Sequence, residues 1–251
     1  MKALLLTLKG SLRSWGNISV GDDRSTGRYP TASAILGLVG ACMGVDAHDK
    51  EQVVAWYNAF HVCTLSVVSY KHKYRLGING THYPIMISDY HTTRDSINMS
   101  RERRKDTIVS HRGYLADALD VAAIIPAHKE AANWLEQLVF AIQQPCSTPY
   151  LGRRSNPLSR PLIEPGEKVI VVQSMEELCD LLLSRLTSQC MDEWIPLDCV
   201  LRVPQQLQTV SETFANKWIF AGKDVIADHR PGRLRFFANR SVCVYKNETE
   251  L

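Results

Sequence analysis

The sequence lacks the short signatures that mark metal-dependent and nucleotide-driven enzymes. It has no C-x-x-C pair and no H-E-x-x-H motif, and no cluster of aspartates resembles a calcium loop. The glycine-rich segment GLVGACMG lacks the lysine and the serine or threonine of a phosphate-binding loop. The seven cysteines show no regular spacing, so we expect buried reduced thiols. We therefore expect neither a metal nor a cofactor.

Long hydrophobic runs are also missing. The longest, residues 35–45, has eleven residues and is too short to cross a membrane. The start, MKALLLTLKG, is not typical of a signal peptide, because Lys9 and Arg13 follow an apolar run that ends at Leu6. Hydrophobic residues make up 45% of the chain, which is enough for a core. We expect a soluble, cytoplasmic protein without membrane contact, folded as one domain over residues 1–251.

Positive charge is concentrated in three segments, although the whole chain carries only +3. Residues 70–113 carry +5, residues 150–160 carry +3 and residues 202–240 carry +4. The remaining chain therefore carries −9. Basic segments on an acidic body are typical of a polyanion binder, with three merely solvated loops as the alternative.

The hydrophobic pattern predicts strands and helices without steady alternation. We expect strands at residues 2–10, 61–71, 113–126, 195–204 and 232–245, and helices at 29–44, 49–60, 128–145 and 174–186. Small residues in the first helix should let it lie close against a sheet. In the last helix, Ser174 and Glu177 stand in capping-box positions, and Met175, Leu178, Leu181 and Leu182 should face inward.

Periodicity disappears between residues 70 and 113. A segment of this length without regular pattern is unusual within a domain and is normally functional. We predict that it forms a basic β-hairpin arm leaving the body. The mixture of elements predicts an α+β body, such as a ferredoxin-like or RNA-recognition (RRM-like) fold.

The loop STPYLGRRSNPLSRPL, residues 147–162, combines three prolines with three arginines and contains no acid. Proline excludes a regular helix and a central strand here. Prolines reduce the entropy lost when a loop becomes ordered. We therefore expect a fixed loop in which Arg153 and Arg154 bind phosphates and Tyr150 stacks on a base.

Three further groups allow two interpretations each. Tyr90, His91 and Arg94, with Lys71 or Lys73 nearby, could cleave RNA without a metal. Alternatively, Asp89 and His91 hydrogen-bond within a strand end or hold RNA without reacting. The run RERRK, residues 101–105, is either a solvated charge run or a phosphate-binding tip. Trp15, beside Arg13, is either a core residue or a stacking platform.

Six stretches together resemble one known family. They are LKGSLRSWG, GRYPTASAILGLVGACMG, SDYHTT, YLADA, TPYLGRRSNPLSRPL and RFFANRSVCVY, in chain order. They are similar to the CasD family, the family-five CRISPR-associated subunit of type I-E Cascade. Asn156 stands where that family usually has cysteine.

The resemblance implies a ferredoxin-like body with a protruding β-hairpin thumb, here the arm of residues 70–113. It also implies a non-catalytic subunit that binds the 5′ handle of a CRISPR RNA (crRNA), contacts the backbone and large subunits, and meets target DNA only through the complex, in antiviral defence. The alternative is a metal-independent endoribonuclease that processes repeat RNA, as in type I-C relatives. A third reading is an α+β protein whose basic loops bind another polyanion or nothing.

From the loops and the resemblance together we predict a set of RNA-binding residues. The set is Arg13, Trp15, Arg28, His91, Arg101, Arg103, Arg104, Lys105, Arg112, Tyr150, Arg153, Arg154, Arg235 and Arg240.

Overall fold

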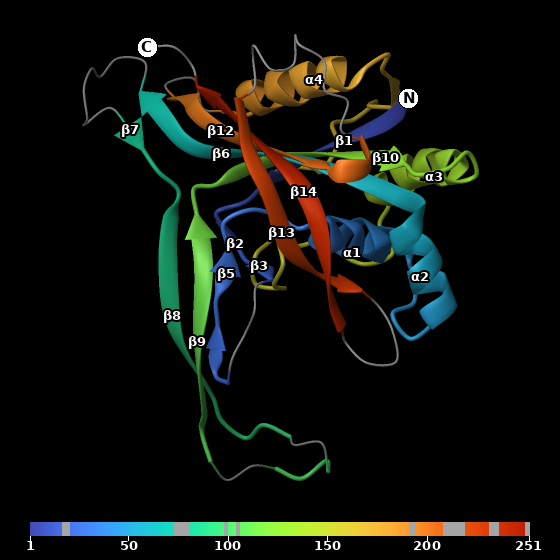
Figure 1. Cartoon of the computed structure of the whole chain (residues 1–251). Helices are drawn as coiled ribbons and strands as arrows, with labels where there is room; N and C mark the ends of the chain where they lie inside the picture. The colour runs from blue at the N-terminus through green and yellow to red at the C-terminus, as the bar shows by residue number, and fades with distance from the viewer. Residues whose placement is uncertain are drawn as a thin grey trace.

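One large antiparallel sheet forms the centre of the molecule (Figure 1). The computed structural model describes residues 1–16, 21–72, 81–97, 100–103, 106–190, 194–207, 219–230 and 236–248. Across the sheet, the strand order is β11 (Ile170–Val171), β1 (Lys2–Lys9), β10 (Leu119–Pro126), β6 (Phe60–His72), β12 (Trp194–Pro204), β14 (Phe236–Glu248) and β13 (Ile219–Arg230). The short β7 (Thr81–His82) also pairs with β6, and a 3-10 turn, η2 (Gln205–Leu207), follows β12.

Helices cover both faces of this sheet. On one face lie α1 (Ala32–Met43), α2 (Lys50–Ala59) and α3 (Ala131–Gln143), whereas α4 (Met175–Ser188) lies on the other (Figure 1). Each face has its own cluster of buried apolar residues, because neighbouring residues of β1, β6 and β10 point to opposite sides. The sheet is therefore buried between two hydrophobic layers at its centre.

Helix α1 lies within the predicted range 29–44, but it begins at Ala32, three residues later than predicted, and ends at Met43. The Thr31 side chain accepts a hydrogen bond from the backbone N–H of Ala34 at 3.2 Å, and Gly44 closes the helix in a left-handed conformation with φ of 77°. The small residues of this helix were expected to face the sheet, but Gly40 contacts α2. A Cβ on Gly40 would lie 2.8 Å from Nε1 of Trp56, so this glycine admits α2 rather than the sheet.

Helix α4 differs from its prediction in one capping contact and in the burial of one leucine. Ser174 accepts a hydrogen bond from the backbone N–H of Glu177 at 3.2 Å. The Glu177 carboxylate, however, accepts from the N–H of Gln173 rather than from that of Ser174. The prediction that Leu181 faces inward is wrong, because its side chain is 37% exposed while Leu178 and Leu182 are fully buried.

A second, smaller sheet contains a hairpin that leaves the body (Figure 1). Strands β8 (Ile85–Thr93) and β9 (Ile108–Ala116) pair antiparallel, and we call residues 85–116 the thumb. These bounds replace the predicted arm of residues 70–113, because residues 70–72 belong to β6 of the central sheet and β9 extends to Ala116. Strand β9 also pairs with β2 (Leu12–Arg13) and with β4 (Asp23–Arg24), which anchor the thumb to the body. Beside them, β3 (Trp15–Gly16) pairs with β5 (Thr26–Gly27).

The single strand predicted at residues 113–126 is wrong, because the structure has two strands there. The chain turns at Asp117, which adopts φ of 54°, so β9 belongs to the thumb and β10 to the central sheet. Strand β13 was not predicted.

The fold class α+β is confirmed. The order β11-β1-β10-β6, with α1 and α2 after β1 and α3 after β10, is compatible with a β-α-β-β-α-β connection. The ferredoxin-like or RRM-like detail stays a prediction. In the part of the chain that the structure describes, no helix is long and apolar enough to cross a membrane.

The described cysteines are free thiols, as predicted from their spacing. Cys42, Cys63, Cys179 and Cys199 are buried, whereas Cys146 is exposed, so the expectation of burial holds for most of them. Burial raises the pKa of Cys42 to about 11 and that of Cys199 to about 12. These thiols are therefore neutral near pH 7 and behave as apolar core groups.

Candidate nucleic-acid interface

The proline-rich loop, residues 147–162, is held closed by its own hydrogen bonds. The backbone N–H of Leu151 donates to the carbonyl of Asn156 at 2.8 Å, and the N–H of Asn156 donates to the carbonyl of Arg153 at 2.9 Å. The Asn156 side chain is 1% exposed, and its Nδ2 donates to the carbonyl of Leu151 at 3.2 Å. A buried side-chain amide thus fixes the turn that carries the arginines.

The same loop is joined to the N-terminal segment along its whole length. The N–H of Thr7 donates to Leu162, that of Ser159 to Lys9 and that of Ser14 to Leu151, with distances of 2.8, 2.9 and 3.0 Å. The loop therefore lies against the end of β1 as a rigid element.

Gly152 allows the closest approach between the loop and the N-terminal segment. Its φ is +87°, and a Cβ there would lie 1.6 Å from the carbonyl oxygen of Ser14. A non-glycine residue is unfavourable here because of the positive φ and because its Cβ would clash with the Ser14 carbonyl. This position explains why glycine precedes the two arginines.

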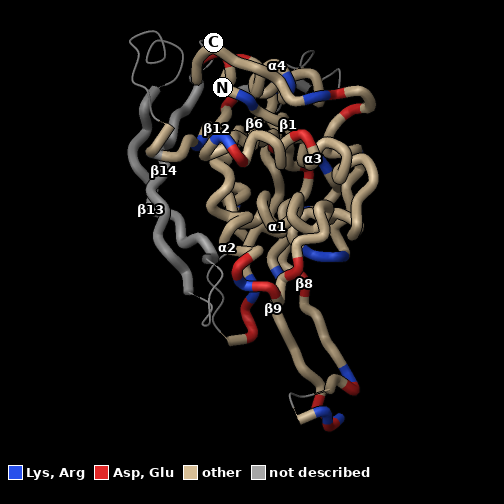
Figure 2. The backbone as a smooth tube through the Cα atoms, turned by 90° about the vertical axis from the view of Figure 1, so that its right-hand side faces the viewer, with Lys and Arg blue, Asp and Glu red and all other residues tan. Residues whose placement is uncertain are grey.

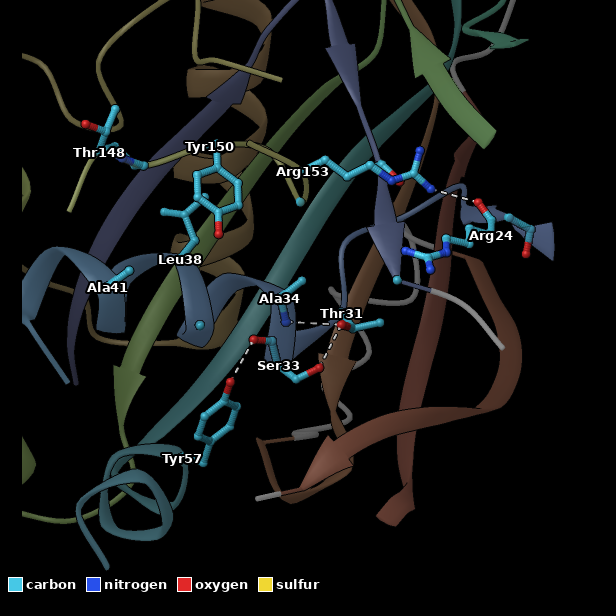
Figure 3. A pocket seen from close by; sticks show the side chains of 16 residues that line it. Arg24, Thr31, Ser33, Ala34, Leu38, Ala41, Tyr57, Thr148, Tyr150 and Arg153 are labelled. Carbon is cyan, nitrogen blue, oxygen red and sulfur yellow. Dashed lines mark hydrogen bonds between the residues drawn. The ribbon is translucent and has the colours of Figure 1, made fainter. Parts of the chain in front are cut away.

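Arg153 connects the loop to the base of the thumb. Its Nη1 donates to the carbonyl of Gly113 in β9 at 3.0 Å, and its Nη2 donates to the carbonyl of Arg24 in β4 at 2.7 Å (Figure 3). The guanidinium also lies 4.5 Å from the ring centroid of Tyr114. Two of its donors are therefore used by the protein, and this differs from the predicted role as a pure phosphate ligand.

A groove with a volume of about 590 Å³ runs between this loop and α1. Figure 3 shows Arg24 and Arg153 at one end, Tyr150 on the loop side, and Thr31 and Ser33 at the start of α1. The groove floor is formed by small residues of α1, namely Ala34, Gly37 and Ala41. It thus combines cationic, aromatic and hydroxyl groups along one rigid wall, which is what single-stranded RNA requires.

Arg13 and Trp15, two residues of the predicted RNA-binding set, are core residues. Each is 1% exposed. The Arg13 guanidinium forms an ion pair with Asp120, and Nε1 of Trp15 donates to the same carboxylate at 3.3 Å. Burial lowers the pKa of Arg13, while the neighbouring carboxylate favours its charged form. The predicted RNA contacts of these two residues are wrong, because they have no surface to offer RNA.

Asp120 itself was missed by the sequence analysis. It is 0% exposed in β10 and pairs across the sheet with Leu8 and Ser66. The sequence does contain a signal, since this aspartate is the single acid within the apolar stretch ALDVAAIIP. A buried acid of this kind requires a cationic partner.

The remaining predicted RNA-binding residues lie in several places. Arg28, Arg101, Arg103 and Arg154 are exposed, and Tyr150 is 36% exposed. Arg112 is half-buried, and its Nε donates to Oγ of Ser110 at 3.2 Å. Arg104, Lys105 and Arg235 lie outside the described residues. Arg240 pairs with Ile226 through the backbone of β14, and its side chain is not among those described.

Tyr90 and His91 are neighbours on β8, so their side chains point to opposite faces of the hairpin. Tyr90 contacts the ring of His111 at 5.4 Å between centroids, and Nδ1 of His91 lies 3.6 Å from Oδ2 of Asp89. The structure does not bring this tyrosine and histidine together in one site. Lys71 lies in β6, and Lys73 falls outside the described residues.

Charges of both signs are mixed over the surface. Figure 2 shows Lys and Arg beside Asp and Glu on the body and at the far end of the thumb. Among the described residues, no group of three or more His, Cys, Asp or Glu side chains could hold a metal ion. The groove is therefore distinguished by its shape and by the chemistry of its walls rather than by a large field of one sign.

Comparisons with known proteins agree with this arrangement. Residues 3–211 match the family model described as CRISPR-associated protein (Cas_Cas5). The CRISPR system Cascade subunit CasD of Escherichia coli (strain K12) is 34% identical over 161 residues, which cover 63% of this chain and 68% of that protein.

Two solved structures share the fold. A chain of a CRISPR RNA-guided surveillance complex has 25% identity and a TM-score of 0.63, with 98% of this chain and 90% of that chain covered. A crystal structure of a Cas protein has 19% identity and a TM-score of 0.57, with 98% and 93% covered, and it supports the fold alone. The chain belongs to the family-five CRISPR-associated proteins.

Proposed function

We propose that this chain is a non-catalytic RNA-binding subunit of a CRISPR Cascade surveillance complex. In this role it holds the 5′ handle of the crRNA in the groove beside α1 and contacts the backbone and large subunits, and it acts in the cytoplasm. The observation that carries the proposal is the rigid groove wall of Tyr150 and Arg153 next to the start of α1. Kinship with a Cascade subunit supports the same role.

By this proposal, Arg153, Tyr150 and Arg154 have different tasks. Arg153 is committed to two carbonyls, so it positions the wall and the thumb base relative to each other. Tyr150 is partly exposed and offers a ring face to a base, and the exposed Arg154 is available for a phosphate. The thumb, by this proposal, inserts beside the RNA where the handle meets the spacer.

The direct test is RNA binding by variants that spare the packing. We expect Tyr150→Ala to weaken binding of handle RNA about tenfold, because stacking of one base is lost. Arg154→Ala should weaken binding and reduce the slope of log K against log salt by about 0.7, the value for one phosphate of a single strand. Lys129→Ala, an exposed residue before α3, is the matched control. Unchanged affinity in both variants would contradict the assignment of RNA to the groove and its loop.

A second measurement distinguishes the non-catalytic role from the alternative of a metal-independent endoribonuclease. End-labelled repeat RNA incubated with the chain in EDTA should remain intact on a denaturing gel. Cleavage that is lost in His91→Ala or Tyr90→Phe would instead identify a metal-independent nuclease and overturn the non-catalytic proposal.

A further inference from the structure

A second cavity, of about 450 Å³, lies at the foot of the thumb and is not part of the groove. Its walls come from the end of β1, from β7, from the corner between β9 and β10, from the proline-rich loop and from the end of α4. The residues that matter here are Lys9, Tyr70, His82, Asp117, Ser159 and Gln189. None of them lines the groove described above.

Positive charge gathers at one end of this cavity. Nζ of Lys9 donates to the carbonyl of Gln189 at 2.7 Å, and Nη1 of Arg160 donates to Oε1 of the same residue at 3.1 Å. Burial, and then the charge of Arg160, lower the pKa of Lys9. The Lys9 ammonium group has three N–H donors, and the Gln189 carbonyl at the end of α4 accepts from one of them. Two like charges beside a half-buried hydroxyl-lined space are suited to an anion.

The other end of the cavity is aromatic and fixed. Tyr70 is 8% exposed, and its hydroxyl donates to the carbonyl of Asp117 at 3.3 Å. The His82 ring lies 6.2 Å from the Tyr70 ring, and its Nε2 is 3.7 Å from the Asp117 carboxylate. Asp117 adopts φ of 54°, a conformation that few non-glycine residues take. The imidazole is therefore held in place with part of its surface open to the cavity.

The proline-rich loop separates the cavity from the groove. Its residues Thr148, Pro149, Tyr150, Gly152 and Arg153 line the groove, while Ser159 lines the cavity. A Cβ on Gly10 would lie 2.7 Å from both Leu151 and Pro157, so the loop is seated tightly over the end of β1 between the two spaces. The groove and the cavity therefore lie next to different parts of the same loop.

We propose that this cavity is a nucleotide pocket that receives one flipped nucleotide of the bound RNA. The phosphate lies toward Lys9 and Ser159, and the base stacks on His82 above the Tyr70 floor. The cavity volume is within the range of small-ligand sites, and extruded bases stacked on aromatic side chains are the common mode of single-strand recognition. The inference rests on the proposed function and adds a second binding position to it.

The test combines ultraviolet cross-linking with binding of the same handle RNA to matched variants of the full chain. We expect cross-linked peptides that contain Tyr70 or His82. His82→Ala should lower RNA affinity about tenfold without changing the salt slope, and Lys9→Gln should lower both. Lys50→Gln, an exposed lysine on α2, should change neither.

The outcomes separate this inference from the proposed function. If Tyr150→Ala weakens binding while His82→Ala and Lys9→Gln bind as the parent does, the nucleotide pocket is overturned and the groove stands. If the parent chain binds no RNA, the proposed function is overturned, and the pocket with it. A third measurement is titration of the parent chain with each of the four nucleoside monophosphates. If these bind but His82→Ala and Lys9→Gln leave RNA affinity unchanged, the cavity binds free nucleotides and its assignment to RNA is overturned.

Discussion

At the scale of single residues, Gly152 decides the shape of the groove. We predict that Gly152→Ala destabilises the chain by more than the ~1–3 kcal/mol expected for positive φ alone, because its Cβ would also meet the Ser14 carbonyl at 1.6 Å. The loop must shift to accept the methyl group. The measurement is the free energy of unfolding in urea, together with handle RNA binding.

Gly166 provides the matched control for this prediction. Its φ is +84°, close to that of Gly152, but an added Cβ would meet nothing within 4 Å. Gly166→Ala should therefore show the conformational cost without the clash and should leave RNA binding intact. Equal losses of stability in the two variants would show that the contact with Ser14 does not restrain the loop.

Residue types alone predict burial poorly. The loop arginines and Tyr150 were found from composition, and the structure places Arg154 and Tyr150 at the surface. Arg13 and Trp15 look the same in sequence, yet both are buried. The difference is Asp120, more than a hundred positions away, which compensates the charge of Arg13 in the core. Only the pairing of distant strands reveals such a partner.

At the scale of elements, the thumb exposes an unusual amount of apolar surface. Strand β8 pairs only with β9 among the described strands, and Ile85, Met86 and Ile87 are 51, 48 and 42% exposed. Apolar residues on an open strand edge favour contact with another chain. We therefore predict that the apolar root of the thumb, as well as its charged tip, contacts a partner subunit.

We predict that Ile87→Ser changes the stability of the free chain by no more than about 0.5 kcal/mol, because the side chain is already exposed. The same change should reduce the recovery of other Cascade subunits with the tagged chain. Val54→Ser on α2, where the side chain is 41% exposed, is the control and should leave recovery unchanged. Full recovery with Ile87→Ser would rule out this strand as a contact surface.

Helices were easier to predict than strand boundaries. The capping residue Ser174 and the apolar spacing identify α4 from local sequence, and the hydrophobic pattern identifies α1. The corner at Asp117 contains neither glycine nor proline, so nothing local separates β9 from β10. Strand β13 depends on pairing with β14, which local pattern does not report.

At the scale of the whole molecule, one sheet joins two hydrophobic layers. Leu182 of α4 and Leu135 of α3 lie on opposite faces, and both are fully buried. Because β1, β6 and β10 contribute to both layers, loss of packing on one face should weaken the other. The single domain over residues 1–251 stays a prediction.

We predict that Leu182→Ala lowers the free energy of unfolding by about 2–5 kcal/mol and accelerates hydrogen exchange in α1 and α3 as well as in α4. Leu135→Ala should give the same pattern from the other side. Faster exchange confined to α4 in the first variant and to α3 in the second would indicate two independently unfolding units.

The position of β1 has a consequence for the timing of synthesis. This strand is made first, but its described neighbours in the sheet, β10 and β11, begin at residues 119 and 170. The hydrogen bonds between Ser14 and Leu151 and between Arg24 and Arg153 likewise form only after the second residue of each pair has been synthesised. On the ribosome, then, the emerging N-terminal half has a hydrophobic strand without neighbours and no finished groove. If the groove binds RNA as proposed, the chain can take up RNA only after more than half of it has been translated, when the residues of the thumb have already been synthesised.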